Sequence, residues 1–355
     1  MNWALFSMVV IALVTHPADF TIIDAARGQK PLSALIRQLA DKRVVFIGEN
    51  HERYDNHLDQ LKIIRGLQTQ APDRWVIGVE YVQRRFQPFL DEYINRAISE
   101  DEFLRRTEYF DRWGYDYRLY RPIFRFARDH HIPVIALNAE RELTDEVDKD
   151  GLKALPPADR ARLPEIGSAN AAYRERLRKV FDEHPDTGDF ERFVEVQLVW
   201  DETMADTAAN YLAAHPDKSM IVLAGEGHIA FGSGIPDRIR RRLPGIATAI
   251  LLPADKPDED LEGADYLLVS QMQTLPPSGK MGITLDTTGP LRVKTVAPGS
   301  AAARAGLQSG DRIDAIDSRP VHSLTDFRLA LLEKKPGQRV KLGLQRGTVQ
   351  LTLQR

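Results

Sequence analysis

Two tetrapeptides of the pattern Gly-Glu-x-His, each directly after a short apolar run, constrain the fold of this chain more than any other feature. The first stands at 48–51 after the run 44–47, and the second stands at 225–228 after the run 220–224. Short, continuous runs rich in β-branched residues are typical of buried strands in a parallel sheet. In an open α/β sheet, ligands bind outside the carboxyl ends of the strands. We therefore expect His51 and His228 to lie together at that edge.

Two further apolar runs bring polar side chains to the same edge of the predicted sheet. The run 75–79 leads into Glu80, and the run 133–137 leads into Asn138, with Arg141 shortly after it. Amphipathic helical patterns at 32–40, 57–70 and 191–214 alternate with the runs. This alternation predicts the α/β class, with a mainly parallel sheet flanked by helices. The charged, proline-containing segment 151–188 predicts a helical insertion.

Composition excludes several kinds of site. The chain has no cysteine, which rules out disulfides, iron–sulfur clusters, thiolate zinc sites and a cysteine nucleophile. Its net charge of −3 at pH 7 gives no basic face for nucleic acid. The dense basic stretch 238–242 is interpreted as a solvated helix face.

The N-terminal segment predicts export. Residues 3–14 are almost all apolar, which is shorter than the roughly 20 residues of a membrane span but suits a secretion signal. We therefore predict a signal peptide or N-terminal anchor at 1–18 and a periplasmic or cell-envelope location. A start codon assigned too early is the alternative.

The C-terminal segment 279–355 resembles a PDZ domain of the bacterial periplasmic-protease type, and 256–278 is the expected linker. The elements Ala-Pro-Gly-Ser at 297–300, Ala-Gly-Leu at 305–307 and Gly-Asp-Arg-Ile at 310–313 stand in that family's order. The resemblance implies that a peptide adds a strand beside the helix 323–332, with its C-terminal carboxylate on the amides of a loop. The predicted peptide-binding residues are Lys280, Met281, Gly282 and Ile283.

Residues 30–255 resemble the ChaN-like haem-binding proteins of the Tiki superfamily. The resemblance rests on both Gly-Glu-x-His segments, on Val79-Glu80, on 138–141 and on 197–205. It implies an α/β sheet with a helical subdomain, a place in the cell envelope and a role in haem or iron acquisition. In haem-binding members the cofactor sits between two protomers, so the resemblance also allows a homodimer.

The first hypothesis from this resemblance is a haem-binding or iron-uptake accessory protein. Its predicted cofactor-binding residues are His51, Glu80, Asn138, Arg141 and His228. The iron would be held by His228 or by a pocket tyrosine, and the propionates would pair with Arg141 or Arg84. The candidate tyrosines are Tyr54, Tyr81, Tyr117 and Tyr120.

Two other functions stay open. In a peptidase-like, metal-dependent hydrolase, His51, Glu80 and His228 would hold a divalent metal ion, and Glu49 or Glu226 would act as the general base. In a scaffold, the PDZ domain alone would recruit envelope proteins or C-terminal peptides.

Overall fold

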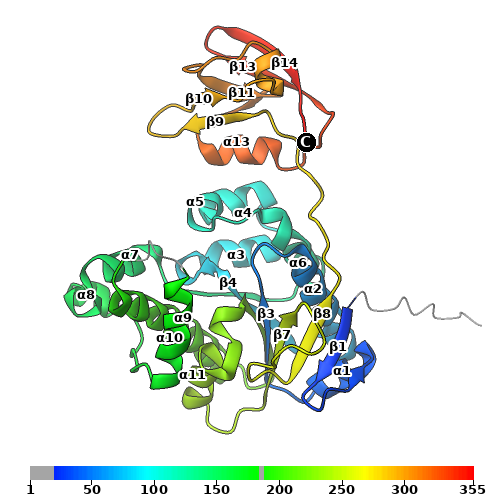
Figure 1. The fold of residues 1–355 in the computed structure, drawn as a ribbon, viewed down its shortest axis with the longest axis vertical. Coiled ribbons are helices and arrows are strands. Elements are labelled where there is room, and N and C mark those ends of the chain that lie inside the picture. The colour runs from blue at the N-terminus through cyan, green and yellow to red at the C-terminus, as the bar shows by residue number, and fades with distance from the viewer. Residues whose placement is uncertain (1–19, 184–187) are drawn as a thin grey trace, which may run out of the picture.

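The computed structural model describes residues 20–183 and 188–355, so the predicted signal segment 1–18 lies outside the described residues. An α/β unit is followed by a smaller β-rich unit, and an extended segment joins them (Figure 1). Within the described ranges, no helix is both long enough and apolar enough to cross a membrane.

One 8-stranded sheet forms the centre of the α/β unit. Its strands are β1 (Phe20–Asp24), β2 (Gln29–Lys30), β3 (Val44–Glu49), β4 (Trp75–Gln83), β5 (Val134–Asn138), β6 (Ser219–Gly225), β7 (Thr248–Ala254) and β8 (Tyr266–Ser270). Their spatial order is β2-β1-β8-β7-β3-β6-β4-β5. The pairings from β8 to β5 are all parallel, and only β1 pairs antiparallel with its neighbours. The predicted mainly parallel sheet is confirmed.

Helices cover both faces of this sheet, which explains why its strands are apolar without alternation. Val45 and Ile47 of β3 face one hydrophobic cluster, and Val44 and Phe46 face the other. The first cluster includes residues of α1 (Leu32–Leu39), α2 (Tyr54–Gln70), α3 (Gln87–Ile94), α4 (Glu100–Arg106) and α6 (Tyr117–Asp129). The second includes residues of α10 (Phe190–Ala214) and α11 (Ile235–Arg242).

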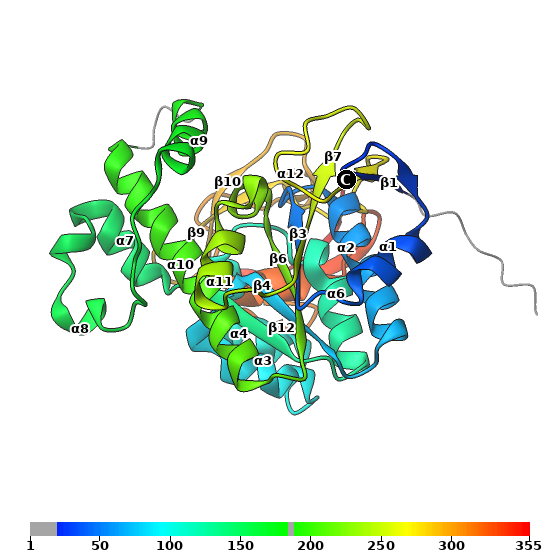
Figure 2. The same cartoon turned by 90° about the horizontal axis from the view of Figure 1, so that it is seen from below.

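The predicted helical insertion forms a lobe beside the sheet. It contains α8 (Pro157–Arg160) and α9 (Ala171–Asp182), and α7 (Arg141–Asp150) precedes it. In Figure 2 these helices project away from the strands, next to α10. Short elements complete the unit: α5 (Tyr109–Arg112), η1 (Arg84–Phe86), η2 (Leu152–Ala154), η3 (Glu226–His228) and η4 (Ala230–Gly232).

The sheet extends beyond the range 30–255 expected for this unit. β1 lies before that range, and β8 lies inside the expected linker 256–278. These two strands pair with each other over their full lengths, and β8 also continues the parallel sheet beside β7. The acidic residues and prolines at 252–263 favour a linker, but the apolar run 266–270 that follows them forms β8. The linker therefore shortens to 271–278.

The C-terminal unit has the strands and the helix expected of a PDZ domain. Its elements are β9 (Ile283–Asp286), β10 (Arg292–Val296), α12 (Ala301–Arg304), β11 (Ile313–Ile316), β12 (Arg319–Pro320), α13 (Leu324–Leu331), β13 (Arg339–Leu344) and β14 (Gly347–Thr352). A two-stranded sheet and a four-stranded sheet enclose a separate core. Ser323 begins α13 with a capping box, in which its hydroxyl and the Asp326 carboxylate each accept from the other's backbone N–H.

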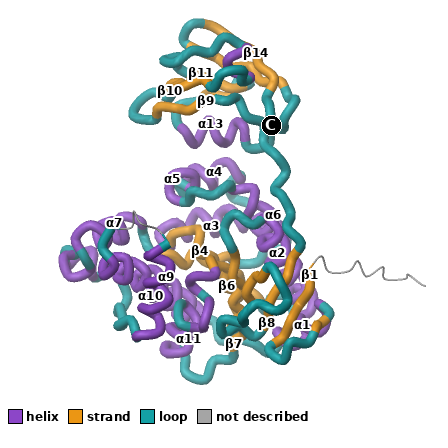
Figure 3. Tube along the Cα trace, viewed as in Figure 1, coloured by secondary structure: helices purple, strands orange, loops and turns teal. Residues whose placement is uncertain are grey.

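The two units pack against each other through α13. This helix lies between the PDZ strands and helices α4 and α5, as the tube in Figure 3 shows. Leu329 is buried in the first cluster of the α/β unit, whereas Leu331 packs on the PDZ core. Arg319 and Asp101 form an ion pair of 3.2 Å across the junction. Arg105 and Asp326 form another.

Candidate functional site

The strand order brings the predicted site residues together. β3, β6, β4 and β5 are consecutive neighbours in the sheet, so the segments that follow them meet at one edge. A cavity of about 320 Å³ lies there. Its lining includes all five predicted cofactor-binding residues, which are His51, Glu80, Asn138, Arg141 and His228. The structure thus brings together the five residues that the sequence pattern assigned to this edge.

Close backbone packing fixes His51 and Glu80 against the end of β6. The Glu80 carboxylate accepts a hydrogen bond of 2.7 Å from the backbone N–H of Gly225. The imidazole of His51 lies so near Gly225 that a Cβ at this glycine would stand 2.9 Å from Cε1 and 3.0 Å from Nε2. Only glycine leaves room for the ring here.

The buried carboxylate of Glu49 contacts the His51 ring at Nδ1. The Glu49 side chain is fully buried, and one of its oxygens lies 2.9 Å from His51 Nδ1 while the other lies 2.8 Å from His57 Nδ1. Burial alone would raise the pKa of Glu49, but the two imidazoles outweigh it and bring the pKa to about 2. Burial lowers and the carboxylates raise the pKa of His51, with a net increase. Glu49 therefore orients His51 and cannot itself touch a ligand.

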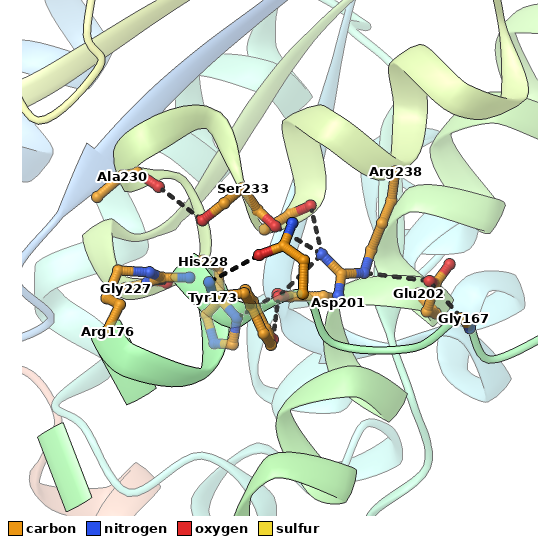
Figure 4. Close-up of polar contacts among 12 residues, drawn as sticks. Gly167, Tyr173, Arg176, Asp201, Glu202, Gly227, His228, Ala230, Ser233 and Arg238 are labelled. Atoms are coloured by element: carbon orange, nitrogen blue, oxygen red, sulfur yellow. Dashed lines mark hydrogen bonds and ion pairs between the residues drawn. The ribbon is translucent and has the colours of Figure 1, made fainter. Parts of the chain in front are cut away.

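His228 lies between two carboxylates. Its Nδ1–H donates to Asp201 at 2.6 Å (Figure 4). Its Nε2 lies 3.4 Å from Glu80. Burial opposes the charged ring, yet Glu80 and Asp201 together raise the pKa of His228 to about 10. The imidazole is therefore protonated at neutral pH.

Asp201, which sequence reasoning missed, is the fixed support of His228. Tyr173 of α9 donates its hydroxyl to the other Asp201 oxygen at 2.7 Å, and Arg238 lies 3.8 Å from that oxygen. Figure 4 shows these groups converging from α9, α10 and α11. In the sequence, Asp201 belongs to a pair of acids, Asp201-Glu202, within an apolar helix, and it lies in the segment 197–205 on which the family resemblance partly rests.

The basic stretch 238–242 is not a solvated face throughout, as the sequence had indicated. Arg238 is 4% exposed and lies 3.2 Å from Glu202. Arg241 and Arg242 reach the same buried carboxylate at 2.6 and 2.7 Å. The stretch therefore neutralises Glu202 within the fold.

Aromatic side chains form the outer wall of the pocket. Trp113 and Tyr115, in the loop between α5 and α6, contact the His51 ring with centroid distances of 5.0 and 4.7 Å. Burial raises the pKa of the Tyr115 phenol, with smaller contributions from nearby acids. Of the four tyrosines named from the sequence, Tyr81 alone lines this pocket. Tyr115 was not among the predicted iron ligands, because the aromatic-rich segment 84–128 that contains it is typical of a helical layer packed on the sheet.

The remaining predicted residues lie elsewhere. Glu226 lines a different cavity, of about 780 Å³, with Arg176 and Phe231. Arg84 pairs with Glu140 at 3.4 Å and does not line the pocket, where Arg112 takes its place. Among the described residues, no group of three or more His, Asp or Glu side chains is placed to hold a metal ion. The structure therefore adds no support to the predicted metal triad of His51, Glu80 and His228.

Close packing fixes the backbone of the predicted peptide-binding loop. Gly282 has φ +80°, and a Cβ there would stand 2.3 Å from Ser300 Cβ. The amides of Met281 and Gly282 donate to no other described residue. The Met281 side chain is buried in the PDZ core, so this residue could contribute only backbone atoms. Lys280 is exposed, and its backbone pairs with Gln354.

Comparisons with known proteins give a family match for each of the two units. The family model described as haem-binding uptake, Tiki superfamily, ChaN matches residues 35–239, and a PDZ domain model matches residues 279–354. A solved structure titled "Cofacial heme binding to ChaN of Campylobacter jejuni" aligns with a TM-score of 0.59 at 18% identity. The alignment covers 71% of this chain and 97% of that one. At this identity the likeness shows the fold.

Two serine endoproteases, of which DegQ is described as periplasmic, are similar to a shorter region of the chain. The serine endoprotease DegQ of Escherichia coli is 41% identical over 54 residues, which is 15% of this chain and 12% of DegQ. A serine endoprotease from Yersinia pestis is 31% identical over 22% of this chain and 29% of its own, with a TM-score of 0.20. The chain thus spans only about an eighth of DegQ.

Proposed function

This chain belongs to the ChaN-like haem-binding uptake family of the Tiki superfamily, and on that basis we propose that it binds haem in the bacterial cell envelope as an accessory of haem or iron uptake. A PDZ module that takes peptide C-termini accompanies the haem site. The observation that carries the proposal is the pocket at the sheet edge, where the predicted residues meet an aromatic wall.

The chemistry of the pocket fits a flat, apolar ligand with acidic groups. Its volume falls at the lower end of the range for small-molecule sites, roughly 300 to 1,000 Å³. Trp113 and Tyr115 line the pocket and contact each other, with 5.5 Å between their ring centroids. Arg141 supplies a charge suited to a propionate. Its side chain is 54% exposed, and its pair with Asp145 is long, at 3.5 Å, and exposed, so a propionate could replace that carboxylate. Bound haem would supply an iron centre with an open coordination position.

Tyr115 is the residue we assign to the iron. Ligation by His228 through Nε2 would require the loss of the Nε2 proton and of the contact with Glu80, which together with Asp201 stabilises the charged ring. In the part of the chain that the structure describes, the Tyr115 phenol forms no ion pair, so it would lose only its own proton. Tyrosinate is an established haem-iron ligand. His51 and Glu80 then form the polar floor behind the ligand.

A haemin titration followed in the Soret region tests this assignment. We expect the wild-type protein to saturate at a simple ratio. Tyr115→Phe should shift the band and weaken binding at least tenfold, because it removes only the ligating oxygen. Tyr117→Phe is the matched control, since Tyr117 is buried and donates to Glu100 away from the pocket. A titration of the wild type that never saturates would refute haem binding.

The envelope location is a separate part of the proposal. It is supported by the apolar segment 3–14 of the sequence. Expression of the full chain in a bacterium, followed by fractionation, tests it. Recovery in the cytosolic fraction alone would contradict it.

A hydrolase is the second candidate, and the observation that favours it is the Glu49–His51 pair at the pocket. A carboxylate behind an imidazole is the arrangement of an oriented general base. The residue in contact with a substrate would be His51, and Glu49 would position it. Hydrolysis of p-nitrophenyl esters and of labelled casein by wild type and by His51→Ala tests this. Equal rates would remove the candidate.

A further inference from the structure

The PDZ helix α13 has two apolar faces. Leu324, Phe327 and Leu331 pack on the PDZ core. Leu329, on another side of the helix, is 4% exposed and belongs to the core of the α/β unit. The wall of the expected peptide groove is therefore held in place by the neighbouring domain.

A cleft of about 310 Å³ opens at this junction. From the PDZ side it is lined by Ser278 at the end of the linker, by Gly279 directly before the predicted peptide-binding residues 280–283 (the carboxylate loop), and by α13. From the α/β side it is lined by the segment 110–118, including Phe110 and Tyr115. Tyr115 lines both this cleft and the pocket of His51.

The two arginines that line the cleft, Arg328 and Arg118, favour an anionic group in it. Arg328 of α13 is exposed, donates to the backbone carbonyl of Phe110 at 2.8 Å, and has no carboxylate partner among the described residues. Arg118 pairs with Asp116 and donates to the carbonyl of Pro276 at 2.8 Å. The unpartnered amides of the carboxylate loop follow directly after Gly279.

The cleft also has an apolar lining from both domains. Phe110 lies under the Arg328 guanidinium, with 5.5 Å between the guanidinium carbon and the ring centroid. Phe327 and Leu331 face it from α13. An occupant that satisfies both features carries a carboxylate next to an apolar side chain. A peptide C-terminus has both within one residue.

We propose that the peptide site of this protein is composite: a peptide with a free carboxylate and an apolar last residue binds in this cleft and contacts Phe110 and Arg118 of the α/β domain as well as the PDZ loop and α13. The proposal rests on the PDZ half of the proposed function and is independent of haem. It makes the α/β domain a determinant of which C-termini are accepted.

Fluorescence anisotropy with the full chain tests the proposal. The probes are fluorescein-labelled decapeptides of one sequence that end in Ala, Val, Leu or Phe, each with a free or an amidated C-terminus. We expect an apolar free carboxylate to bind, and its amide to bind at least tenfold more weakly. Phe110→Ala should weaken the best probe about fivefold or more.

A matched pair of arginines on α6 separates the cleft from the rest of the junction. Arg118→Gln alters the cleft and should weaken binding severalfold. Arg125→Gln removes an arginine that pairs with Glu100 and Glu333 outside the cleft, and it should leave binding unchanged.

Equal affinities for wild type, Phe110→Ala and Arg118→Gln would overturn the proposal, because the peptide would then use the PDZ domain alone. Equal affinities for acid and amide probes, or no binding of any probe, would also overturn it. No haemin is present, so failure of the haem assignment leaves this test unaffected. Arg118 is on the surface of α6, which keeps the result interpretable if Phe110→Ala fails to fold.

Discussion

Replacing Asp201 by asparagine should lower the free energy of unfolding by about 3 kcal/mol at pH 7. Asp201 is 1% exposed and binds both His228 and Tyr173, so the substitution leaves a buried imidazolium with one carboxylate instead of two. Removing one partner of a buried ion pair costs about 3 to 5 kcal/mol. Asparagine still accepts a hydrogen bond, which places the estimate at the lower end of that range.

The pH dependence gives an independent magnitude. The pKa of His228 is about 10 in the folded protein, against the ordinary value of 6.5. Because the folded state holds this proton more tightly, the stabilisation is complete below pH 6.5 and is lost as the pH rises toward 10. Between pH 7 and 9 the wild type should therefore lose about 2 to 3 kcal/mol from this group. The asparagine variant should lose less.

Urea unfolding at pH 7, 8 and 9, followed by tryptophan fluorescence, measures both effects. Trp200 is a local probe, with its ring centroid 6.1 Å from that of His228. Asp206→Asn on the same helix is the control, because Asp206 forms a partly exposed pair with Arg242 worth about 0 to 1 kcal/mol. If Asp201→Asn costs no more than Asp206→Asn, and wild-type stability is flat between pH 7 and 9, the account of a buried charged His228 is refuted.

Three further substitutions test the packing that holds the two sites. Gly225→Ala should displace the His51 ring, cost about 1 to 3 kcal/mol in a urea titration and alter the haemin spectrum, because the new Cβ meets the imidazole. Gly282→Val should abolish peptide anisotropy while haemin still binds, since φ is +80° and Ser300 blocks a side chain. Leu329→Ala should cost about 2 to 5 kcal/mol by calorimetry, because it leaves a cavity at the domain junction.

The two glycine substitutions have controls in the chain. Gly227 and Gly289 have no atoms within 4 Å of a built Cβ, so Gly227→Ala and Gly289→Val should leave both binding assays unchanged. Gly225→Ala with an unaltered haemin spectrum would mean that His51 does not border the ligand. Leu329→Ala with wild-type stability would mean that the junction contributes nothing to folding.

The sequence predicted those parts of the fold that depend on local pattern. Continuous apolar runs predicted the central strands, and the residues after them predicted the pocket, because carboxyl ends of parallel strands share an edge. His51 and His228 were found in this way. β8 was missed because its partner, β1, is distant in the sequence, and no local pattern reports a long-range antiparallel pairing.

The supporting residues of the site could not be predicted for a different reason. Asp201 acts from the middle of a helix, and only the packing of α10 against the end of β6 brings it to His228. Tyr115 lies in a loop whose path follows from how α5 and α6 pack. Glu226 was placed in the site by symmetry with Glu49, but the chain turns into η3 after Gly225 and carries that side chain to another cavity.

The burial of Leu329 in the α/β core changes what the PDZ domain can do mechanically. A PDZ domain on a flexible linker can occupy many positions around the α/β domain, and it raises the local concentration of its bound peptide near that domain. A module anchored through its own groove helix has no such reach. A bound peptide would therefore have its C-terminus held at one fixed distance and direction from the sheet edge. Residue count along that peptide, rather than linker length, would decide which segment arrives at the pocket of His51.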